Sequence, residues 1–250
     1  MLEFQNVSVR YESELLAHIN FGLRAGEIAV LLGRNGVGKT TLLRTVTGEV
    51  RYEGCILAGG TPLKALTARE RARRVSLLPQ HLPAPALSVR EVVAMGFSPI
   101  AARLSPTQWQ AVDETLEQLS LSSLAQRPLC TLSGGERQRA FLATVLLQNA
   151  PVLLMDEPTT YMDLSFRSRF FSLLSEQKTC GKTILLVLHD LAEAVAVADR
   201  ILLLEDGTLS FDGTPSQFIR EEVAQKHFSV RHYTAERDGK TMHFFAPDAP

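Results

Sequence analysis

The chain of 250 residues predicts an α/β fold with a mainly parallel core sheet. Short, continuous apolar runs recur along it, as in parallel strands that are buried on both faces, and helical segments separate these runs. The first 24 residues alternate between apolar and polar side chains, which predicts half-buried strands. From Ser88 to about Pro128 the pattern becomes helical, which predicts a helical subdomain inserted into the sheet domain.

The composition is that of one large globular unit. Hydrophobic residues make up 45% and charged residues 21%, and 26 basic against 27 acidic residues leave a net charge of −1. This balance does not favour a nucleic acid as partner. The cysteines Cys55, Cys130 and Cys180 are too far apart for a metal or redox motif, so we expect reduced thiols in the cytoplasm. The N-terminus lacks a signal pattern and no segment approaches the ~18 apolar residues of a membrane span, so a partner would supply any membrane part.

The N-terminal part is expected to contain strands, a capped helix and a linker. The strands are expected at residues 2–7, 19–23, 28–32, 54–58 and 75–78. Thr67 and Glu70 form a capping-box pattern, in which side chains satisfy free backbone N–H groups at the start of a helix. The basic run from Arg69 to Arg74 is expected to be a solvated face of that helix. Two prolines exclude a helix interior from residues 81–87, which predicts a linker.

Capping signals also mark the later helices. Ser88 begins one helix, and Ser105 with Pro106 begins another, whose apolar residues recur every three or four positions. Asp190 and Glu193 favour a further helix start. The other expected elements are strands at 152–155, 183–188, 201–204 and, weakly, within 228–245, and helices at about 163–177, 190–198 and after 214.

The segment from Gly33 to Thr40 fits the phosphate-binding motif G-x-x-x-x-G-K-[ST] between an apolar strand and a helix. Its glycines allow successive backbone N–H groups to face one anion, and the helix N-terminus adds the positive end of its dipole. Lys39 is expected to reach the β- and γ-phosphates of a nucleotide, and the Thr40 hydroxyl to ligate magnesium. The predicted nucleotide-binding residues are Gly33, Arg34, Asn35, Gly36, Val37, Gly38, Lys39, Thr40 and Thr41.

Four further positions suit hydrolysis of a bound nucleotide. Asp156 and Glu157 end an apolar run, where the aspartate can hold magnesium and the glutamate can orient or deprotonate the attacking water. His189 ends a second run and can donate a hydrogen bond to a γ-phosphate. Gln80 stands at the start of the linker, where its amide can touch magnesium or water.

The pentapeptide Leu132-Ser133-Gly134-Gly135-Glu136 predicts a second anion site. Ser133 is a favourable helix N-cap, and the glycines expose backbone N–H groups of the helix that follows. In their order along the chain, these motifs resemble those of the nucleotide-binding subunit of an ATP-binding cassette (ABC) transporter, over at least residues 2–218.

The resemblance implies a P-loop NTPase of the ABC cassette type. One nucleotide-binding domain is expected over residues 1–228, with a RecA-like core, an N-terminal antiparallel β subdomain and an α-helical subdomain inserted at about 88–150. Residues 229–250 are expected to form a short C-terminal β extension. The resemblance also implies an ATPase that works as a homodimer, with ATP and magnesium held between the phosphate-binding loop of one copy and the Leu132–Glu136 segment of the other.

The same resemblance assigns roles to individual residues. Tyr11 matches the aromatic that stacks on adenine, and Gln80 matches the Q-loop glutamine that couples the nucleotide to a permease. Asp156 and Glu157 match the Walker B aspartate and the catalytic glutamate, and residues 160–163 match the D-loop. The implied catalytic residues are Lys39, Gln80, Glu157 and His189; the implied magnesium ligands are Thr40, Gln80 and Asp156; and the nucleotide-binding set gains Tyr11, Ser133, Gly134, Gly135 and Asp163.

Residues 72–81 and 157–164 are similar to the ATPases of ferric-siderophore and iron-dicitrate importers, a group that also imports haem and cobalamin. This likeness implies two transmembrane permease subunits, a periplasmic or lipoprotein binding protein, and a peripheral position on the cytoplasmic face of the inner membrane. Two departures from that branch are Gly-Phe-Ser-Pro-Ile at residues 96–100, where Gly-Arg-x-Pro-His is usual, and Met162 in place of the D-loop leucine. The first lies near the expected permease contact.

Other functions remain open alternatives. The cargo could be haem or cobalamin instead of a ferric siderophore or iron dicitrate. A soluble ABC protein that acts on DNA or ribosomes is disfavoured by the single cassette and the short insert. A nucleotide switch without catalysis is disfavoured by Glu157 and His189.

Overall fold

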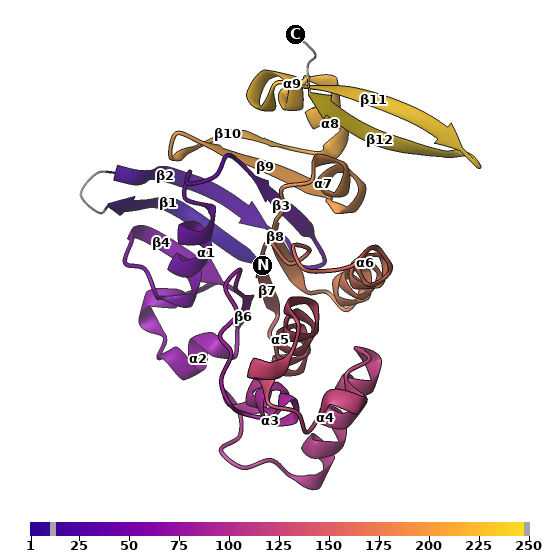
Figure 1. Cartoon of the computed structure of the whole chain (residues 1–250). Helices are drawn as coiled ribbons and strands as arrows, with labels where there is room; N and C mark the ends of the chain where they lie inside the picture. Colours follow the sequence, from indigo (N-terminus) through magenta and orange to yellow (C-terminus); the bar gives the residue numbers. More distant parts are fainter. Residues whose placement is uncertain (11–13, 248–250) are drawn as a thin grey trace.

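The computed structural model, drawn in Figure 1, describes residues 1–10 and 14–247. Within this part its central sheet has the strand order β10-β9-β3-β8-β7-β6. The strands are β3 (Ile28–Leu32), β6 (Val75–Leu78), β7 (Val152–Asp156), β8 (Thr183–Val187), β9 (Arg200–Glu205) and β10 (Thr208–Gly213). Neighbours from β9 to β6 are parallel, whereas β10 is antiparallel to β9. The predicted α/β class with a mainly parallel core sheet is confirmed.

Strand β3 illustrates how the central sheet is buried on both faces. All five of its residues are buried, and successive side chains point to opposite faces. Val30 and Leu32 belong to the hydrophobic cluster of helices α5, α6 and α7, whereas Ala29 and Leu31 belong to a second cluster with α1 and the N-terminal strands. The helices are α1 (Lys39–Thr47), α5 (Gly134–Gln148), α6 (Leu164–Thr179) and α7 (Leu191–Val197). The sheet is therefore a buried middle layer.

A second sheet packs with α1 on that second side. Its order in the described residues is β2-β1-β4-β5, and its neighbours are antiparallel. Its strands are β1 (Leu2–Arg10), β2 (Glu14–Leu23), β4 (Glu53–Ala58) and β5 (Thr61–Pro62). Phe4 and Phe21 stack across β1 and β2, with ring centroids 4.3 Å apart. The predicted N-terminal strands therefore form an antiparallel β subdomain, as expected.

Helices between β6 and β7 lie at the lower end of the molecule in Figure 1. They are α3 (Val89–Ala94), α4 (Pro106–Gln118), the 3-10 turns η2 (Met95–Phe97), η3 (Ser122–Leu124) and η4 (Leu129–Thr131), and then α5. Ser88 begins a helix with the predicted capping box, and Ser105 is the predicted N-cap of α4, where Gln108 completes a capping box that was not predicted. Val112 and Leu116 are buried on the predicted apolar face of α4.

Across residues 1–10 and 14–247, no helix is both long and apolar enough to cross a membrane.

Helix α2 (Ala68–Ala72) begins at the predicted capping box and follows the short turn η1, at residues 63–65. Its basic run is more than a solvated face. Arg71 donates three hydrogen bonds to backbone carbonyls of nearby turns, and Arg69 and Arg73 both donate to the same carbonyl beyond η2. These guanidinium groups connect α2 to backbone carbonyls of other segments, so they fix α2 to its surroundings.

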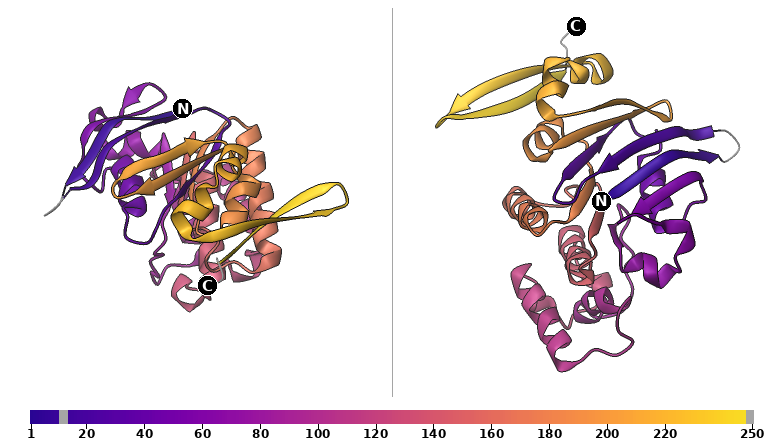
Figure 2. Two further views of the ribbon diagram at one scale, coloured as in Figure 1. Left: turned by 90° about the horizontal axis from the view of Figure 1, so that it is seen from above. Right: turned by 180° about the vertical axis from the view of Figure 1, so that it is seen from behind.

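The chain ends in a β-hairpin that projects from the body of the molecule (Figure 2). Strand β11 (Val230–Arg237) pairs antiparallel with β12 (Lys240–Pro247), after α8 (Pro215–Arg220) and α9 (Val223–Phe228). The weak strand signal therefore marks a real hairpin. Strand β10 and helix α9 were not predicted; α9 has six residues and lacks a side-chain cap, so it leaves little signal in the sequence.

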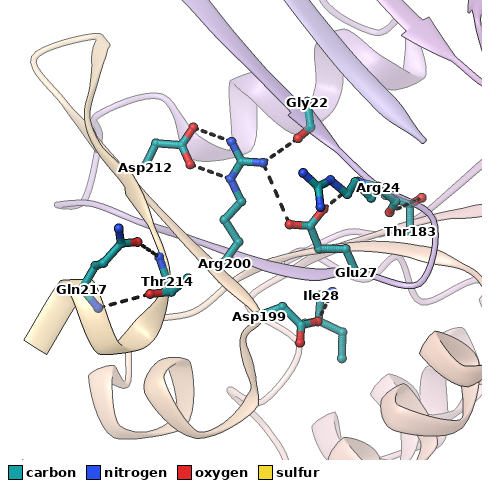
Figure 3. Close-up of polar contacts among 10 residues, drawn as sticks. All are labelled: Gly22, Arg24, Glu27, Ile28, Thr183, Asp199, Arg200, Asp212, Thr214 and Gln217. Carbon is teal, nitrogen blue, oxygen red and sulfur yellow. Dashed lines mark hydrogen bonds and ion pairs between the residues drawn. The ribbon is translucent and has the colours of Figure 1, made fainter.

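Paired polar groups close the edge where β3, β8 and β9 begin (Figure 3). Arg200 donates hydrogen bonds of 2.5 and 2.7 Å to the Asp212 carboxylate in β10, and one of 2.7 Å to the Gly22 carbonyl in β2. The Asp199 carboxylate accepts a 2.9 Å hydrogen bond from the N–H of Ile28, at the start of β3. The network joins both sheets at the edge opposite the carboxyl ends of the parallel strands.

Candidate active site

The loop from Gly33 to Gly38 connects the carboxyl end of β3 to the amino end of α1. Gly33 has φ 152°, and a Cβ there would lie 2.4 Å from the carbonyl oxygen of Leu204. Gly38 has φ 108°, and a Cβ there would lie 2.8 Å from the Leu16 side chain. Both backbone conformations and both close approaches require glycine. The loop therefore places backbone N–H groups and a helix N-terminus at one point, the arrangement that binds a phosphate.

A pocket of about 310 Å³ opens at this loop. It combines four parts of the chain: the loop with the start of α1, and the residues that follow β6, β7 and β8. The lining residues are Asn35, Gly36, Gly38, Lys39, Thr40, Thr41, Gln80, Glu157 and His189. The predicted site residues are thus neighbours in space, although more than a hundred positions separate the first from the last in the sequence.

The Lys39 side chain folds back over its own loop. Its ammonium Nζ donates hydrogen bonds of 2.7 Å to the Gly33 carbonyl and 2.9 Å to the Arg34 carbonyl, and the residue is buried. Burial lowers the pKa of this ammonium, and the charges of Glu157 and Asp156 act against that shift. A phosphate in the loop would give the buried cation an anionic partner.

Asp156 is the last residue of β7, and it is only 2% exposed. Its Oδ1 atom finds no hydrogen-bond partner among the described residues. Burial raises the pKa of the carboxyl, and a hydrogen bond with Thr40 acts in the opposite direction. A hard cation such as Mg²⁺ prefers oxygen ligands and binds proteins through one or two such groups, filling its shell with water and phosphate oxygens. The unpartnered Asp156 oxygen and the Thr40 hydroxyl fit this requirement.

Glu157 and His189 form a close pair at the wall of the pocket. Nε2 of His189 lies 2.5 Å from Oε1 of Glu157, whose side chain is 14% exposed. Glu157 has φ 50°, an uncommon value for a residue with a side chain, and its N–H donates to the Val187 carbonyl at 3.1 Å. The strand ends thus hold a carboxylate and an imidazole beside the phosphate-binding loop, where they can accept and hold a proton.

The remaining residues of the phosphate-binding loop surround this pocket. Gly33 is buried behind the loop, whereas Arg34 and Val37 line an adjacent pocket of about 560 Å³. In that pocket Arg34 donates a 3.2 Å hydrogen bond to the backbone carbonyl of His227 in α9. Tyr11, the predicted adenine-stacking residue, lies outside the described residues.

The predicted second anion site lies apart from the pocket. Ser133 is exposed at the N-cap of α5, and its hydroxyl lies 2.7 Å from Oε2 of Glu136 in a capping box. Gly134 and Gly135 begin α5 and are covered by Tyr161, which a Cβ at Gly134 would meet at 3.1 Å. Asp163 caps α6, where its carboxylate accepts the N–H of the third residue along, at 2.8 Å. One copy of the chain therefore does not bring these residues to its own phosphate-binding loop.

Sequence reasoning missed a group of polar residues behind Glu157. The buried Gln138 amide of α5 donates a 2.5 Å hydrogen bond to the Pro158 carbonyl. Arg167 of α6 forms a 2.8 Å ion pair with Glu193 of α7. These residues lie 20 to 34 positions from their partners, so no local pattern reveals them. Glu193 was noted only as part of a helix start.

Comparison with known proteins decides the family. The family model described as "ABC transporter" matches residues 16–160. The chain belongs to the ABC transporter family. Among curated relatives, it is 41% identical to a hemin import ATP-binding protein of Streptomyces coelicolor, over 81% of this chain and 74% of the relative. It is 35% identical to a petrobactin import ATP-binding protein of Bacillus anthracis, over 86% of this chain and 81% of the relative.

Solved structures agree with this assignment. A metal-chelate type ABC transporter in an inward-facing conformation matches with a TM-score of 0.83 and 28% identity, covering 99% of this chain and 97% of that one. A dimeric ATP-binding cassette bound to ADP and Pi matches with a TM-score of 0.79 and 25% identity, covering 86% of this chain and 99% of that one. As a member of this family of import ATPases, the chain binds and hydrolyses ATP.

Proposed function

We propose that this ABC ATPase powers the import of an iron chelate through a separate membrane permease, as a homodimer with two ATP molecules between its copies. The observation that carries the proposal is the separation within one copy: Lys39, Glu157 and His189 meet in one pocket, whereas Ser133 is exposed elsewhere. A second copy in head-to-tail contact would bring its Ser133 segment to the open side of the pocket. The related dimeric cassette with ADP and Pi supports this arrangement.

The charges of the pocket suit γ-phosphoryl transfer, in which the transition state spreads negative charge over the phosphate oxygens. Lys39 would exchange its carbonyl partners for the β- and γ-phosphates. Thr40 and Asp156 would hold magnesium, with Gln80 at the same pocket. When bound there, magnesium would help to neutralise the negative charge that develops on the phosphate oxygens.

The pair Glu157 and His189 would act on the attacking water. The Glu157 carboxylate accepts a proton from the water and orients it toward the γ-phosphate. Nε2 of His189 lies 2.5 Å from that carboxylate. When nucleotide is bound, the same N–H would donate to the γ-phosphate instead. Tyr11 would stack on the adenine ring, and Asp163 would contribute from the D-loop.

The shared site is tested by Ser133→Arg in the full chain. A large cation at this N-cap blocks the approach of a second copy, so we expect ATP hydrolysis to fall to background while the isolated chain binds ATP with unchanged affinity. Ser105→Arg is a matched control, because Ser105 is an exposed N-cap with the same capping-box geometry on α4. Hydrolysis at the wild-type rate by Ser133→Arg, or by a chain that stays monomeric with ATP, would refute the proposal.

The relatives favour an iron-containing cargo, because their names refer to petrobactin and hemin import. We propose a ferric siderophore or iron dicitrate as the cargo, with haem or cobalamin as the alternative. The chain would sit at the cytoplasmic face of the inner membrane on two permease subunits, which receive cargo from a periplasmic or lipoprotein binding protein. Uptake of radiolabelled ferric siderophore, iron dicitrate, haem and cobalamin by cells with the chain and its permease distinguishes these cargoes.

Co-purification tests the choice between a transporter subunit and a soluble ABC ATPase. We expect a polytopic permease to co-purify with the tagged chain, and nucleic acid or ribosomes to be absent. We propose residues 1–228 as the nucleotide-binding domain, with the helical subdomain at about 88–150, and residues 229–250 as a short C-terminal β extension.

A further inference from the structure

The segment after Glu157 is held from behind by two helices. Thr159 lies two residues beyond Glu157, and its hydroxyl donates a 3.3 Å hydrogen bond to Oε2 of Glu193 in α7. The Thr159 carbonyl accepts a 3.4 Å hydrogen bond from Nη2 of Arg167 in α6. Arg167 and Glu193 are themselves joined by the 2.8 Å ion pair between Nη1 and Oε1. The three residues form a closed triangle.

This triangle connects the two segments that carry the candidate catalytic pair. Glu157 is two residues before Thr159, and His189 is four residues before Glu193, directly ahead of Asp190, the N-cap residue of α7. Asp190 lies between them, and its carboxylate caps the start of α7 by accepting hydrogen bonds from the N–H groups of Ala192 and Glu193. A shift of Glu193 would therefore change the separation of Glu157 and His189.

The ion pair is sheltered enough for its loss to matter. The Glu193 side chain is 13% exposed and the Arg167 side chain 32%. Burial raises the pKa of the Glu193 carboxyl, and Arg167 acts against this shift. When one member of such a pair is removed, the other is left with an unpaired charge or an unsatisfied hydrogen bond, and the segment it held becomes free to move.

We propose that Glu193, together with Arg167 and Thr159, is a positioning residue for hydrolysis: it fixes the distance between Glu157 and His189 and does not itself touch the nucleotide. This inference rests on the proposed roles of Glu157 and His189. It predicts a specific kinetic signature, because none of the three residues lines the pocket at the phosphate-binding loop. Loss of Glu193 should slow the hydrolytic step and leave nucleotide binding intact.

The test compares ion pairs on the same helix. Glu193→Gln keeps the shape of the side chain and removes its charge, and Arg167→Gln removes the partner charge. The control is Lys178→Gln, because Lys178 also lies on α6 and forms a 2.6 Å ion pair with Asp199, which directly follows the end of α7 and its C-cap residue. That pair is far along α6 from Thr159. Thermal unfolding of each purified full-length variant reports any general loss of structure.

We expect Glu193→Gln and Arg167→Gln each to lower kcat for ATP about tenfold, which corresponds to about 1.4 kcal/mol, with KM within twofold of the wild type. Lys178→Gln should keep both parameters. Because the two residues act as one pair, the double variant should be no slower than the slower single variant. Glu193→Asp keeps the charge and should recover part of kcat.

Either of two results would overturn the inference. One is a kcat of Glu193→Gln that equals that of Lys178→Gln; the other is a loss that appears in KM and thermal stability and leaves kcat unchanged. Glu157→Gln, measured in parallel, separates this failure from failure of the proposed function. If Glu157→Gln still hydrolyses ATP, the catalytic assignment fails; if it is inactive and Glu193→Gln is normal, only the positioning role fails.

Discussion

The two edges of the central sheet differ in how their polar groups are paired. At the edge where the strands begin, Arg200 bonds to Asp212 and to the Gly22 carbonyl, and Asp199 pairs with Lys178 as well as with the start of β3. At the opposite edge, Asp156 is buried with an unpartnered oxygen. The central sheet therefore has paired polar groups where β3 and β9 begin, and a buried carboxylate oxygen without a partner among the described residues where β7 ends.

This difference separates stability from function. A buried polar group without a partner costs about 1–3 kcal/mol, and at Asp156 a bound cation would offset that cost. Glu157 adds an uncommon backbone conformation, at φ 50°, on the same edge. The paired groups at the edge where the strands begin stabilise the fold that holds Asp156 and Glu157 in place. Changes at the two edges should therefore affect different measurements.

The largest effect is expected from Glu157→Gln at the functional edge. An amide cannot accept the proton of the attacking water, so kcat should fall by at least about 100-fold, the lower range for loss of a general base. ATP affinity should be retained, because the phosphate-binding loop is unchanged. Steady-state hydrolysis and equilibrium binding of ATP provide the measurement, and hydrolysis like that of the wild type would remove Glu157 from the mechanism.

Arg200→Ala tests the opposite edge. The change removes hydrogen bonds to two strands and leaves Asp212 without its bidentate partner, so we expect the free energy of unfolding to fall by about 2 kcal/mol. KM and kcat of the folded protein should not change. Arg220→Ala is the control, because the Arg220 side chain is 72% exposed and its loss should change stability by less than about 0.5 kcal/mol. Denaturant titration measures the free energy of unfolding of both variants. A lower kcat in folded Arg200→Ala would contradict the assignment of this edge to stability alone.

The smallest effect is expected in the pH dependence of stability at Asp156. Because burial raises the pKa of this carboxyl above 3.8, the folded chain keeps its proton where the unfolded chain has lost it. The stability of the wild type should therefore fall relative to Asp156→Asn as the pH rises through the range above 3.8, and the difference should level off at higher pH.

Magnesium provides the complementary measurement for Asp156. At neutral pH, ATP with magnesium should raise the melting temperature of the wild type more than ATP with EDTA, and this increment should shrink in Asp156→Asn. An equal increment in both proteins would show that Asp156 is not a ligand. The pH series without nucleotide tests the burial of the carboxyl independently of the metal.

Local signals predicted most of the elements. The predicted capping boxes at Thr67 and Ser88 and the predicted N-caps at Ser105 and Ser133 lie where helices begin, because a cap depends on residues only a few positions apart. The phosphate-binding loop was predictable for the same reason, because its glycines and Lys39 lie within one short, contiguous segment of the sequence. Pairings across longer distances were not predictable. The basic run of α2 was expected to face solvent, but Arg71 satisfies carbonyl oxygens of turns that only the folded chain brings near it.

The sequence by itself determined the order of buried strands and capped helices, the phosphate-binding loop, and the identity of the groups that follow each strand. These features depend on residues that are close together in the sequence, so the sequence alone is enough to predict them. The tertiary structure decided which of those groups meet: Glu157 with His189 at the pocket, Ser133 away from it, and Glu193 with Arg167 behind it. It alone could do so, because these contacts depend on parallel strands ending at one edge and on helices packing behind it.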